Sequence, residues 1–327
     1  MRVLVTGGAG YIGSHTVRAL RERGDDVVVL DSMEFGHRAA LADTPLVQGD
    51  TADEELVARL LAEHAIEAVI HFAAYKSAGE SMERPARYFQ NNVCGTLGLL
   101  RAMQRVGVPH IVFSSSSAVY GTPEHLPVSE ESPLHPESPY GESKLMVEQM
   151  LRWFETCHGL RFASLRYFNA AGAALDARIG EDWTVTLNLI PLVMKAALGK
   201  LPQLTVYGSD YPTPDGTAIR DYIHVVDLAD AHIMALEHLR AHQRSLILNL
   251  GTGHGSSVKE VIDTAREVSG VDIPVQYADR RPGDPVALYA DRAKAQQALG
   301  WQPRYDLREI IASAWRWHST HPNGYRE

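Results

Sequence analysis

The chain has 327 residues, of which 45% are hydrophobic and 22% are charged, and its formal net charge is -9. This length and composition indicate a globular protein with a large core and enough chain for two lobes. The acidic balance, without any basic block, argues against nucleic acid or a membrane surface as a partner and favours a small ligand. Two cysteines that form no Cys-x-x-Cys pair, together with the lack of a signal peptide or a membrane-spanning apolar run, predict a cytoplasmic protein.

A strand, a glycine turn and a helix are predicted at the start of the chain. Residues 2–6 are a short apolar run, and the turn at 7–13 carries glycines three apart. The helix that follows presents unpaired amides, which can bind a pyrophosphate. The next apolar run, 27–30, ends at Asp31, eighteen residues after Gly13, where a carboxylate accepts ribose hydroxyls and repels a 2′-phosphate. The cofactor predicted from this arrangement is NAD, not NADP.

Two further buried strands follow. Residues 46–50 end at Asp50, which is placed to meet the adenine edge; the alternative is that Asp50 caps the next helix, and both roles are compatible. Residues 68–74 form an apolar strand that ends in small residues, which leave room for a cofactor. His71 within this strand is interpreted as a core histidine without a catalytic role.

The segment 138–144, with the sequence SPYGESK, opens a helix and carries the predicted acid–base chemistry. Ser138 can cap the helix, and Tyr140 and Lys144 then lie one turn apart on one face. We expect the Lys144 ammonium to lower the pKa of Tyr140, which makes Tyr140 a general base. Taken alone, such a pair is more often a core tyrosine beside a surface lysine. The catalytic interpretation is favoured here because the strand at 110–113 runs into four serines shortly before the pair.

Beyond residue 170 the hydrophobic pattern becomes irregular, which predicts a second lobe. The expected fold is α/β, a Rossmann-type doubly wound parallel sheet with a smaller C-terminal α/β substrate lobe. Residues 1–170 are assigned to the NAD-binding domain, with 222–250 returning to it, and the lobe comprises 171–221 and 251–327.

Two charged clusters in this second half have alternative interpretations. Arg220 and the basic-then-acidic turn at 280–284 could neutralise a diphosphate, and the alternative is a pair of surface salt bridges. His238 and His242, four residues apart, could bridge a metal, but no third ligand is evident, so no metal site is predicted.

Several motifs give the chain a resemblance to a known family. The glycine spacing resembles the extended short-chain dehydrogenase/reductase superfamily. Together with segments 138–144, 165–169 (LRYFN) and 215–225 (DGTAIRDYIHV), it is similar to the UDP-glucose 4-epimerase family over nearly the whole chain. The resemblance implies an NAD-dependent isomerase of galactose and carbohydrate metabolism that interconverts UDP-glucose and UDP-galactose. It also implies tightly kept NAD and a homodimer formed through a helical bundle.

The resemblance implies roles for individual residues as well. Tyr140 removes the 4-hydroxyl proton while the C4 hydride passes to NAD, and the keto sugar turns before the hydride returns. The implied catalytic residues are Ser116, Tyr140 and Lys144. The implied cofactor-binding residues are Gly7, Gly10, Tyr11, Ile12, Gly13, Asp31, Asp50, Thr51, Phe72, Ala73, Lys76, Asn91, Tyr140, Lys144 and Tyr167. The implied UDP-sugar-binding residues are Lys76, Ser116, Tyr140, Asn169, Asn188, Leu189, Thr205, Tyr207, Arg220, Arg281, Asp284 and Leu288.

Leu288 bears on the sugar that is accepted. In the family a large tyrosine at this position restricts the enzyme to glucose and galactose, whereas small residues admit N-acetylated sugars. Leucine is intermediate, so the resemblance implies some activity on UDP-N-acetylhexosamines.

Three alternatives are weighed against the epimerase interpretation. A UDP-pentose 4-epimerase of the same superfamily stays open. A dehydratase is disfavoured because Ser117 and Ala118 stand where an acid–base pair is needed. A non-catalytic NAD-sensing protein is disfavoured because Ser116, Tyr140 and Lys144 are all present.

Overall fold

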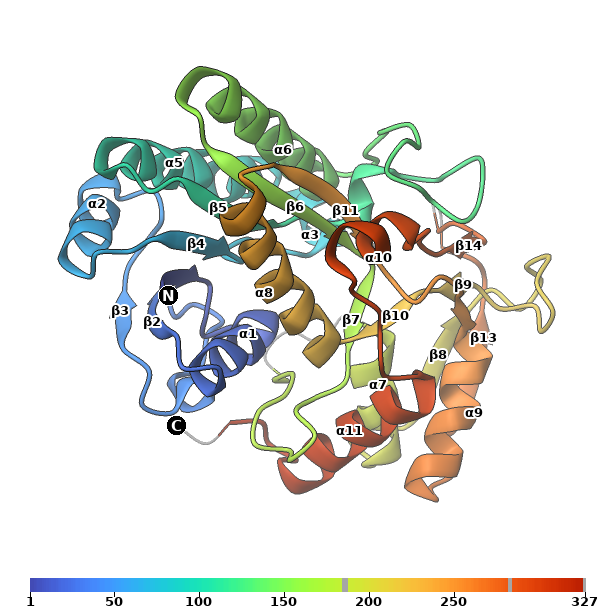
Figure 1. Ribbon diagram of the computed structural model, residues 1–327. Coiled ribbons are helices and arrows are strands. Elements are labelled where there is room, and N and C mark those ends of the chain that lie inside the picture. Colours follow the sequence, from blue (N-terminus) through green and yellow to red (C-terminus); the bar gives the residue numbers. More distant parts are fainter. Residues whose placement is uncertain (184–187, 282–283, 326–327) are drawn as a thin grey trace.

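Seven parallel strands form the central sheet of the computed structural model, which describes residues 1–183, 188–281 and 284–325 (Figure 1). Their order is β11-β6-β5-β4-β1-β2-β3. The strands are rich in Val, Ile and Leu and are largely buried, as parallel strands covered on both faces are. They are β1 (Arg2–Thr6), β2 (Asp26–Asp31), β3 (Leu46–Gln48), β4 (Ala68–His71), β5 (His110–Ser114), β6 (Arg161–Tyr167) and β11 (Leu246–Leu250). The predicted doubly wound sheet is confirmed.

Helices cover both faces of this sheet, and side-chain alternation along β1 separates the two cores. Val3 and Val5 point to the face that α1 (Tyr11–Glu22) and α8 (Val225–His242) cover. Leu4 points to the other face. Three helices cover that face: α2 (Glu54–Glu63), α5 (Gly95–Val106) and α6 (Pro139–His158).

Short helical segments connect these layers near the carboxyl ends of the strands. After β4 the chain forms α3 (Ala78–Glu83) and α4 (Pro85–Tyr88), and a π-helical turn (Phe89–Cys94) continues into α5. Single-turn 3-10 helices lie at Arg38–Leu41 and Ser117–Val119.

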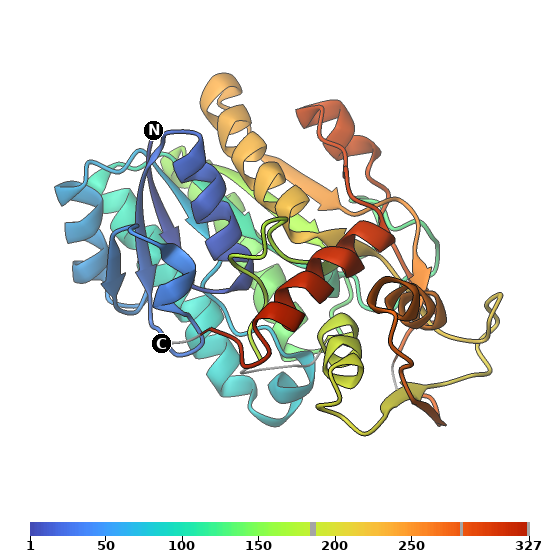
Figure 2. The same cartoon turned by 90° about the horizontal axis from the view of Figure 1, so that it is seen from below.

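A second, smaller layer has its own apolar core, as predicted. It contains α7 (Leu189–Ala197), α9 (Val258–Ser269) and α11 (Leu307–Thr320), which Figure 2 shows grouped beside the sheet domain. Its strands are β7 (Asn169–Ala171) with β10 (Tyr222–His224), β8 (Leu204–Tyr207) with β13 (Val275–Ala278), and β9 (Ile219–Arg220) between β12 (Ser256–Ser257) and β14 (Ala287–Leu288).

The chain crosses between the two layers more than once. After β6 it enters the second layer, and it then returns through α8 and β11 to the edge of the central sheet. The helix α10 (Ala293–Leu299) and Trp301 also pack in the core under α8, so this part of residues 251–327 lies against the sheet domain.

A buried ion pair joins α6 to the sheet. Arg166 on β6 donates from Nε to Glu148 Oε1 at 2.9 Å and from Nη2 to Glu148 Oε2 at 2.5 Å, and both side chains are 1% exposed. Ser115 Oγ donates to the same carboxylate at 2.7 Å. Tyr120 OH accepts from Arg166 Nη1 at 2.9 Å and donates to Asn249 Oδ1 on β11 at 2.7 Å. The two charges are thus surrounded by hydrogen-bond partners, which buried charges need.

Replacing Glu148 with leucine leaves the Arg166 guanidinium buried without its counter-charge. We expect Glu148→Leu to lower the free energy of unfolding by about 3–5 kcal/mol, measured by urea denaturation with NAD in excess. The matched control is Glu22→Leu, because Glu22 is a helical carboxylate paired with Arg18 at 2.7 Å but 63% exposed. The control should lose less than about 1 kcal/mol; equal losses would show that burial of the first pair is unimportant.

Candidate active site

A groove lies at the carboxyl edge of the central sheet, where open α/β sheets bind ligands. It encloses about 1570 Å³ of empty space, counted out to its open mouth. The glycine turn after β1 forms part of its wall, and Tyr140 and Lys144 of α6 line it as well. Every residue that the resemblance implied for cofactor binding lines this one groove, although these residues come from segments far apart in the sequence.

The glycine turn leaves no room for side chains. Gly7 has a φ of +69°, and a Cβ there would lie 2.6 Å from the backbone nitrogen of Ala73. A Cβ on Gly13 would lie 2.2 Å from the Gly7 carbonyl oxygen. Gly10 stands at the N-cap of α1, where a glycine supplies no capping side chain. The first amides of α1 and this close backbone approach suit a pyrophosphate, so the turn fits a dinucleotide.

Asp31 is fixed at the end of β2. Its carboxylate accepts hydrogen bonds from the backbone N–H groups of Ala9 and Met33, each at 2.9 Å. Burial raises the pKa of Asp31, and these two bonds oppose that effect. Because each oxygen keeps a second lone pair, the carboxylate can still accept ribose hydroxyls.

Asp50 lines the groove and does not cap α2. Its carboxylate accepts from the backbone N–H of Ala52 at 2.8 Å, whereas Asp53 is the N-cap and accepts from Leu56 at 3.0 Å. The alternative that Asp50 is the helix cap is therefore wrong. The N-cap of α2 is Asp53, three residues after Asp50.

Two of the implied catalytic residues, Tyr140 and Lys144, line the groove, and the third, Ser116, lies close to Tyr140. Ser138 caps α6, accepting from the backbone N–H of Gly141 at 3.2 Å. This orients the first turn so that the Tyr140 side chain lies close to that of Ser116, just after β5. Lys144 Nζ lies 5.9 Å from the centre of the Tyr140 ring and donates to the Ser114 carbonyl at 2.8 Å.

The expected lowering of the Tyr140 pKa by Lys144 is wrong for the protein chain alone. Burial raises the pKa of Tyr140, and the nearby Ser116 side chain opposes this. Burial also lowers the pKa of Lys144 to about 7, against the attraction of Glu148. The same desolvation that makes the site dry therefore disfavours both charged forms, the phenolate and the ammonium.

The residues implied to bind the UDP-sugar lie mostly around the second layer. Arg220 and Asp284 form an ion pair with each other, and the Arg281 guanidinium lies 3.8 Å from the centre of the Tyr207 ring. In the protein chain alone, Arg220 therefore forms a salt bridge, as the alternative to diphosphate binding predicts. Leu288 pairs in register with Arg220 across β14 and β9.

The remaining members of that set lie on β7, α7 and β8. Asn169 Nδ2 donates to the Asp221 carbonyl at 3.1 Å. Asn188 is exposed at the N-cap of α7, and Leu189 is the first residue of that helix. Thr205 Oγ1, on β8 with Tyr207, accepts from Gln276 at 2.8 Å.

Some residues that line the groove were not predicted from the sequence. Glu181 is buried, and its carboxylate lies 3.5 Å from Lys76 Nζ. Tyr325, near the end of the chain, contacts both the N–H and the carbonyl of Gly180 through its hydroxyl at 3.0 Å. No local pattern marks these residues, because only the folded chain brings them to the groove.

His71 is the core histidine that its sequence context predicts. Its Nδ1 lies 2.6 Å from Thr6 Oγ1 and its Nε2 lies 2.8 Å from Thr96 Oγ1. Among the residues that the structure describes, no group of three or more His, Cys, Asp or Glu side chains could hold a metal ion. No helix in that part of the chain is long and apolar enough to cross a membrane.

Comparison with known proteins identifies the family. A family model described as GDP-mannose 4,6 dehydratase matches residues 4–314. The UDP-glucose 4-epimerase of Halalkalibacterium halodurans is 50% identical over 326 residues, which cover 99% of this chain and 98% of that protein. The chain belongs to the UDP-glucose 4-epimerase family. It is accordingly an NAD-dependent isomerase, as the resemblance implied.

Solved structures agree with this assignment. A crystal structure of UDP-glucose-4-epimerase from Stenotrophomonas maltophila, with bound NAD and formylated UDP-arabinopyranose, has a TM-score of 0.96 and 45% identity and covers 98% of this chain and 99% of that one. The UDP-Glc/GlcNAc 4-epimerase of Campylobacter jejuni has a TM-score of 0.87 and 41% identity, with coverage of 98% and 99%. The predicted cofactor, NAD, is confirmed at the level of the family.

The glycine turn can be tested with two alanine substitutions. We expect Gly13→Ala to be purified with little bound NAD and to lose about 1–3 kcal/mol of stability, because its Cβ would meet the Gly7 carbonyl. The control is Gly79→Ala in α3, where a Cβ has nothing within 4 Å. NAD released by acid is quantified for each variant. Full NAD content in Gly13→Ala would contradict the assignment of this turn to the cofactor.

Proposed function

We propose that this epimerase interconverts UDP-glucose and UDP-galactose with Tyr140 as the group that takes and returns the proton of the sugar's 4-hydroxyl. The main support for the proposal is that Tyr140 lines the groove with its side chain close to that of Ser116. A phenol and a serine hydroxyl held together there can both reach one sugar oxygen. Lys144 lies one turn along the same helix.

Each residue then has a distinct task. Ser116 orients the 4-oxygen, Tyr140 accepts its proton, and the same phenol returns the proton to the 4-keto oxygen after the sugar has turned. Bound NAD supplies the hydride acceptor, the returning hydride and a positive charge. Burial raises the pKa of Tyr140, so its phenolate is a strong base once formed. Lys144, which also lines the groove, would bind the ribose next to the nicotinamide.

We propose that residues of the second layer bind the UDP group of the substrate. Arg220 pairs with Asp284, and Arg281 lies over the Tyr207 ring. Asn169 and Asn188 add amide groups to this cluster. Holding UDP firmly and the sugar loosely lets the keto sugar turn without leaving. Release of the Arg220 guanidinium from Asp284 would free it for the diphosphate.

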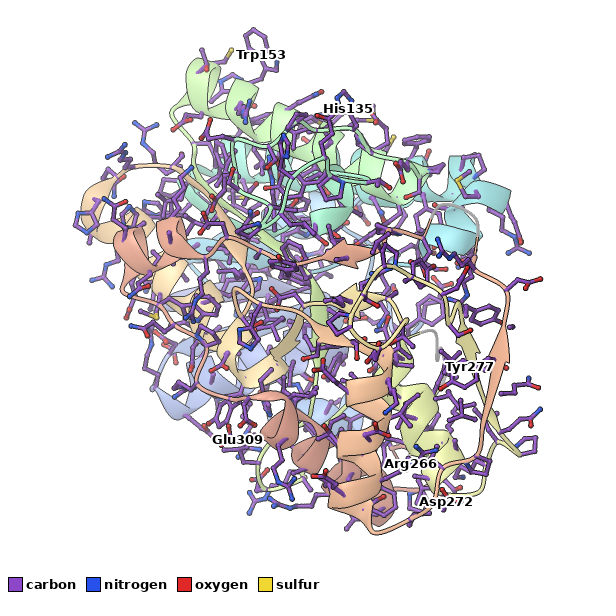
Figure 3. All side chains as sticks on the ribbon, turned by 90° about the vertical axis from the view of Figure 1, so that its right-hand side faces the viewer. His135, Trp153, Arg266, Asp272, Tyr277 and Glu309 are labelled. Carbon is purple, nitrogen blue, oxygen red and sulfur yellow. The ribbon has the colours of Figure 1, made fainter. Side chains whose placement is uncertain are left out.

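Removing the phenol hydroxyl tests the base. We expect Tyr140→Phe to lower kcat for UDP-galactose about 10²–10⁴-fold, without added NAD, while the purified protein keeps its NAD. The control is Tyr277→Phe, because Tyr277 is 57% exposed on β13 and lies at the outer edge of the molecule in Figure 3. A loss of less than tenfold in Tyr140→Phe would refute its assignment as the base.

We propose that UDP-N-acetylhexosamines are also accepted, at a lower rate. Leu288 packs against an apolar cluster that contains Tyr120, Phe168 and Val119, and Val119 lies three residues after Ser116. Its side chain is smaller than the tyrosine that excludes N-acetyl groups in the family. A related structure is that of a UDP-Glc/GlcNAc 4-epimerase, which supports this wider range.

Enlarging this side chain should narrow the substrate range. We expect Leu288→Tyr to lower kcat/KM for UDP-N-acetylgalactosamine about tenfold or more relative to UDP-galactose, because a steric contact discriminates by such factors. Leu175→Tyr, at an exposed leucine, is the control. An unchanged ratio of the two kcat/KM values would remove Leu288 from the sugar site. UDP-arabinose, assayed in parallel, tests the pentose alternative.

A homodimer through α5 and α6 is proposed as well. These helices carry exposed apolar side chains, and Trp153 projects outward from α6 in Figure 3. Trp153 is 68% exposed, which is unusual for a side chain of its size. Measuring the molar mass of the protein in solution tests whether it is a dimer. The exposed apolar residues on the two helices are Leu97, Val106, Met146 and Trp153.

A further inference from the structure

Two loops flank the glycine turn at the mouth of the groove. In the sheet, β2 and β4 lie on either side of β1, so the loops that follow them, 32–37 and 72–77, stand on either side of the turn. Both loops line the groove. A dinucleotide with its pyrophosphate at the glycine turn would therefore lie between them.

Side chains from these loops meet across the mouth. Tyr75 OH donates to Glu34 Oε2 at 2.6 Å. The Arg87 guanidinium bonds the other oxygen of Glu34 and also Glu80, and its Cζ lies 4.1 Å from the centre of the Tyr75 ring. Phe35 meets the Tyr75 ring edge-on, with the ring centres 6.2 Å apart.

The β4 side of this contact is firmly anchored. The Asn92 side chain accepts from the Tyr75 N–H at 2.9 Å and donates to the Tyr75 carbonyl at 3.1 Å. It also donates to Ser143 on α6 at 3.0 Å. Tyr88 OH accepts from Ser77 N–H and donates to Glu80, each at 3.1 Å.

On the β2 side, the end of the loop is anchored at His37, whose N–H donates to the Ala9 carbonyl at 3.0 Å and whose ring stacks on that of Tyr325. The middle of the loop is more lightly held. Glu34 and Phe35 are 42% and 44% exposed, and the backbone N–H of Glu34 is 3.3 Å from Ser32 Oγ, within its own loop. The contacts with Tyr75 and Arg87 are thus what join this loop to the opposite wall. Breaking them would let residues 34 and 35 move away from the opposite wall while His37 and the β4 side stay in place.

We propose that Glu34, Tyr75 and Arg87 form a clasp across the groove that sets the rate at which NAD leaves the enzyme. The clasp joins the two walls over the place where the dinucleotide binds, so it must open before the cofactor can escape. The catalytic cycle regenerates NAD and needs no release, and a closed clasp keeps the cofactor in place between turnovers. The inference rests on the cofactor and not on the assignment of Tyr140.

The exposure of the clasp predicts a dependence on salt. The side chains of Glu34 and Arg87 are 42% and 30% exposed, so added salt screens their attraction. Release of NAD should therefore become faster at higher ionic strength. This dependence should disappear when the arginine is removed.

The test measures exchange of the bound cofactor. Protein purified with NAD is mixed with excess deuterated NAD, and the isotope content of the bound fraction is followed by mass spectrometry. We expect exchange to be up to about fivefold faster in Arg87→Gln and several-fold faster in Tyr75→Phe, the factors that follow from losing an exposed ion pair or one hydrogen bond. Tyr75→Phe keeps the ring that packs on Arg87 and Phe35.

Arg84→Gln is the matched control. Arg84 lies three residues before Arg87 and is 65% exposed. Among the residues that the structure describes, its one ion pair is with Glu80, at 3.9 Å. We expect its exchange rate to be unchanged, and the unfolding temperatures of all variants to stay within about 2 °C of one another. Equal exchange rates in Arg87→Gln and Arg84→Gln would overturn the proposal. So would a salt dependence that survives in Arg87→Gln, or faster exchange accompanied by a matching loss of stability.

Discussion

The buried pair of Glu148 and Arg166 is the constraint on which the rest of this site depends. An ion pair that is 1% exposed on both sides is tolerable only with accurate geometry and further hydrogen bonds, and here Ser115, Tyr120 and Asn249 provide them. These partners come from the end of β5, from the segment after it and from β11. Any shift of α6 relative to the sheet would therefore leave a charge unpaired.

That constraint reaches the catalytic residues directly. Lys144 is one helical turn before Glu148, and Ser116 follows Ser115 in the chain. The network thus fixes the two chain segments that carry Tyr140 and Ser116 relative to each other. Rigid support of this kind is what acid–base catalysis needs, because proton transfer depends on short, well-aligned contacts.

The residues that hold α6 against the sheet also affect the pKa values of the catalytic residues. Glu148 opposes the fall in the pKa of Lys144 that burial causes, even though its carboxylate is already shared with Arg166. The desolvated interior that gives the ion pair its rigidity also raises the pKa of Tyr140. In the protein chain alone, burial thus disfavours both the Tyr140 phenolate and the Lys144 ammonium.

Sequence patterns predicted the sheet and most of the groove because these features are local. Apolar runs mark the strands, glycines three apart mark the turn, and Asp31 stands at the end of its strand. The errors concern burial and long-range contact. Spacing showed that Lys144 lies near Tyr140 but could not show how dry the site is. Glu181 and Tyr325 reach the groove only through tertiary folding, and two-residue strands such as β12 are too short to have a period.

The position of β11 has a consequence for synthesis of the protein. The ribosome completes β6 at residue 167 but must add roughly 80 more residues before β11 can pair with it, which takes about 4–16 s at ordinary elongation rates. During that interval the nascent domain presents an open strand edge, and the side chains of Val112, Ala163 and Leu165 lack the cover of α8. Until residue 250 has left the exit tunnel, that edge is free to pair with strands of other chains.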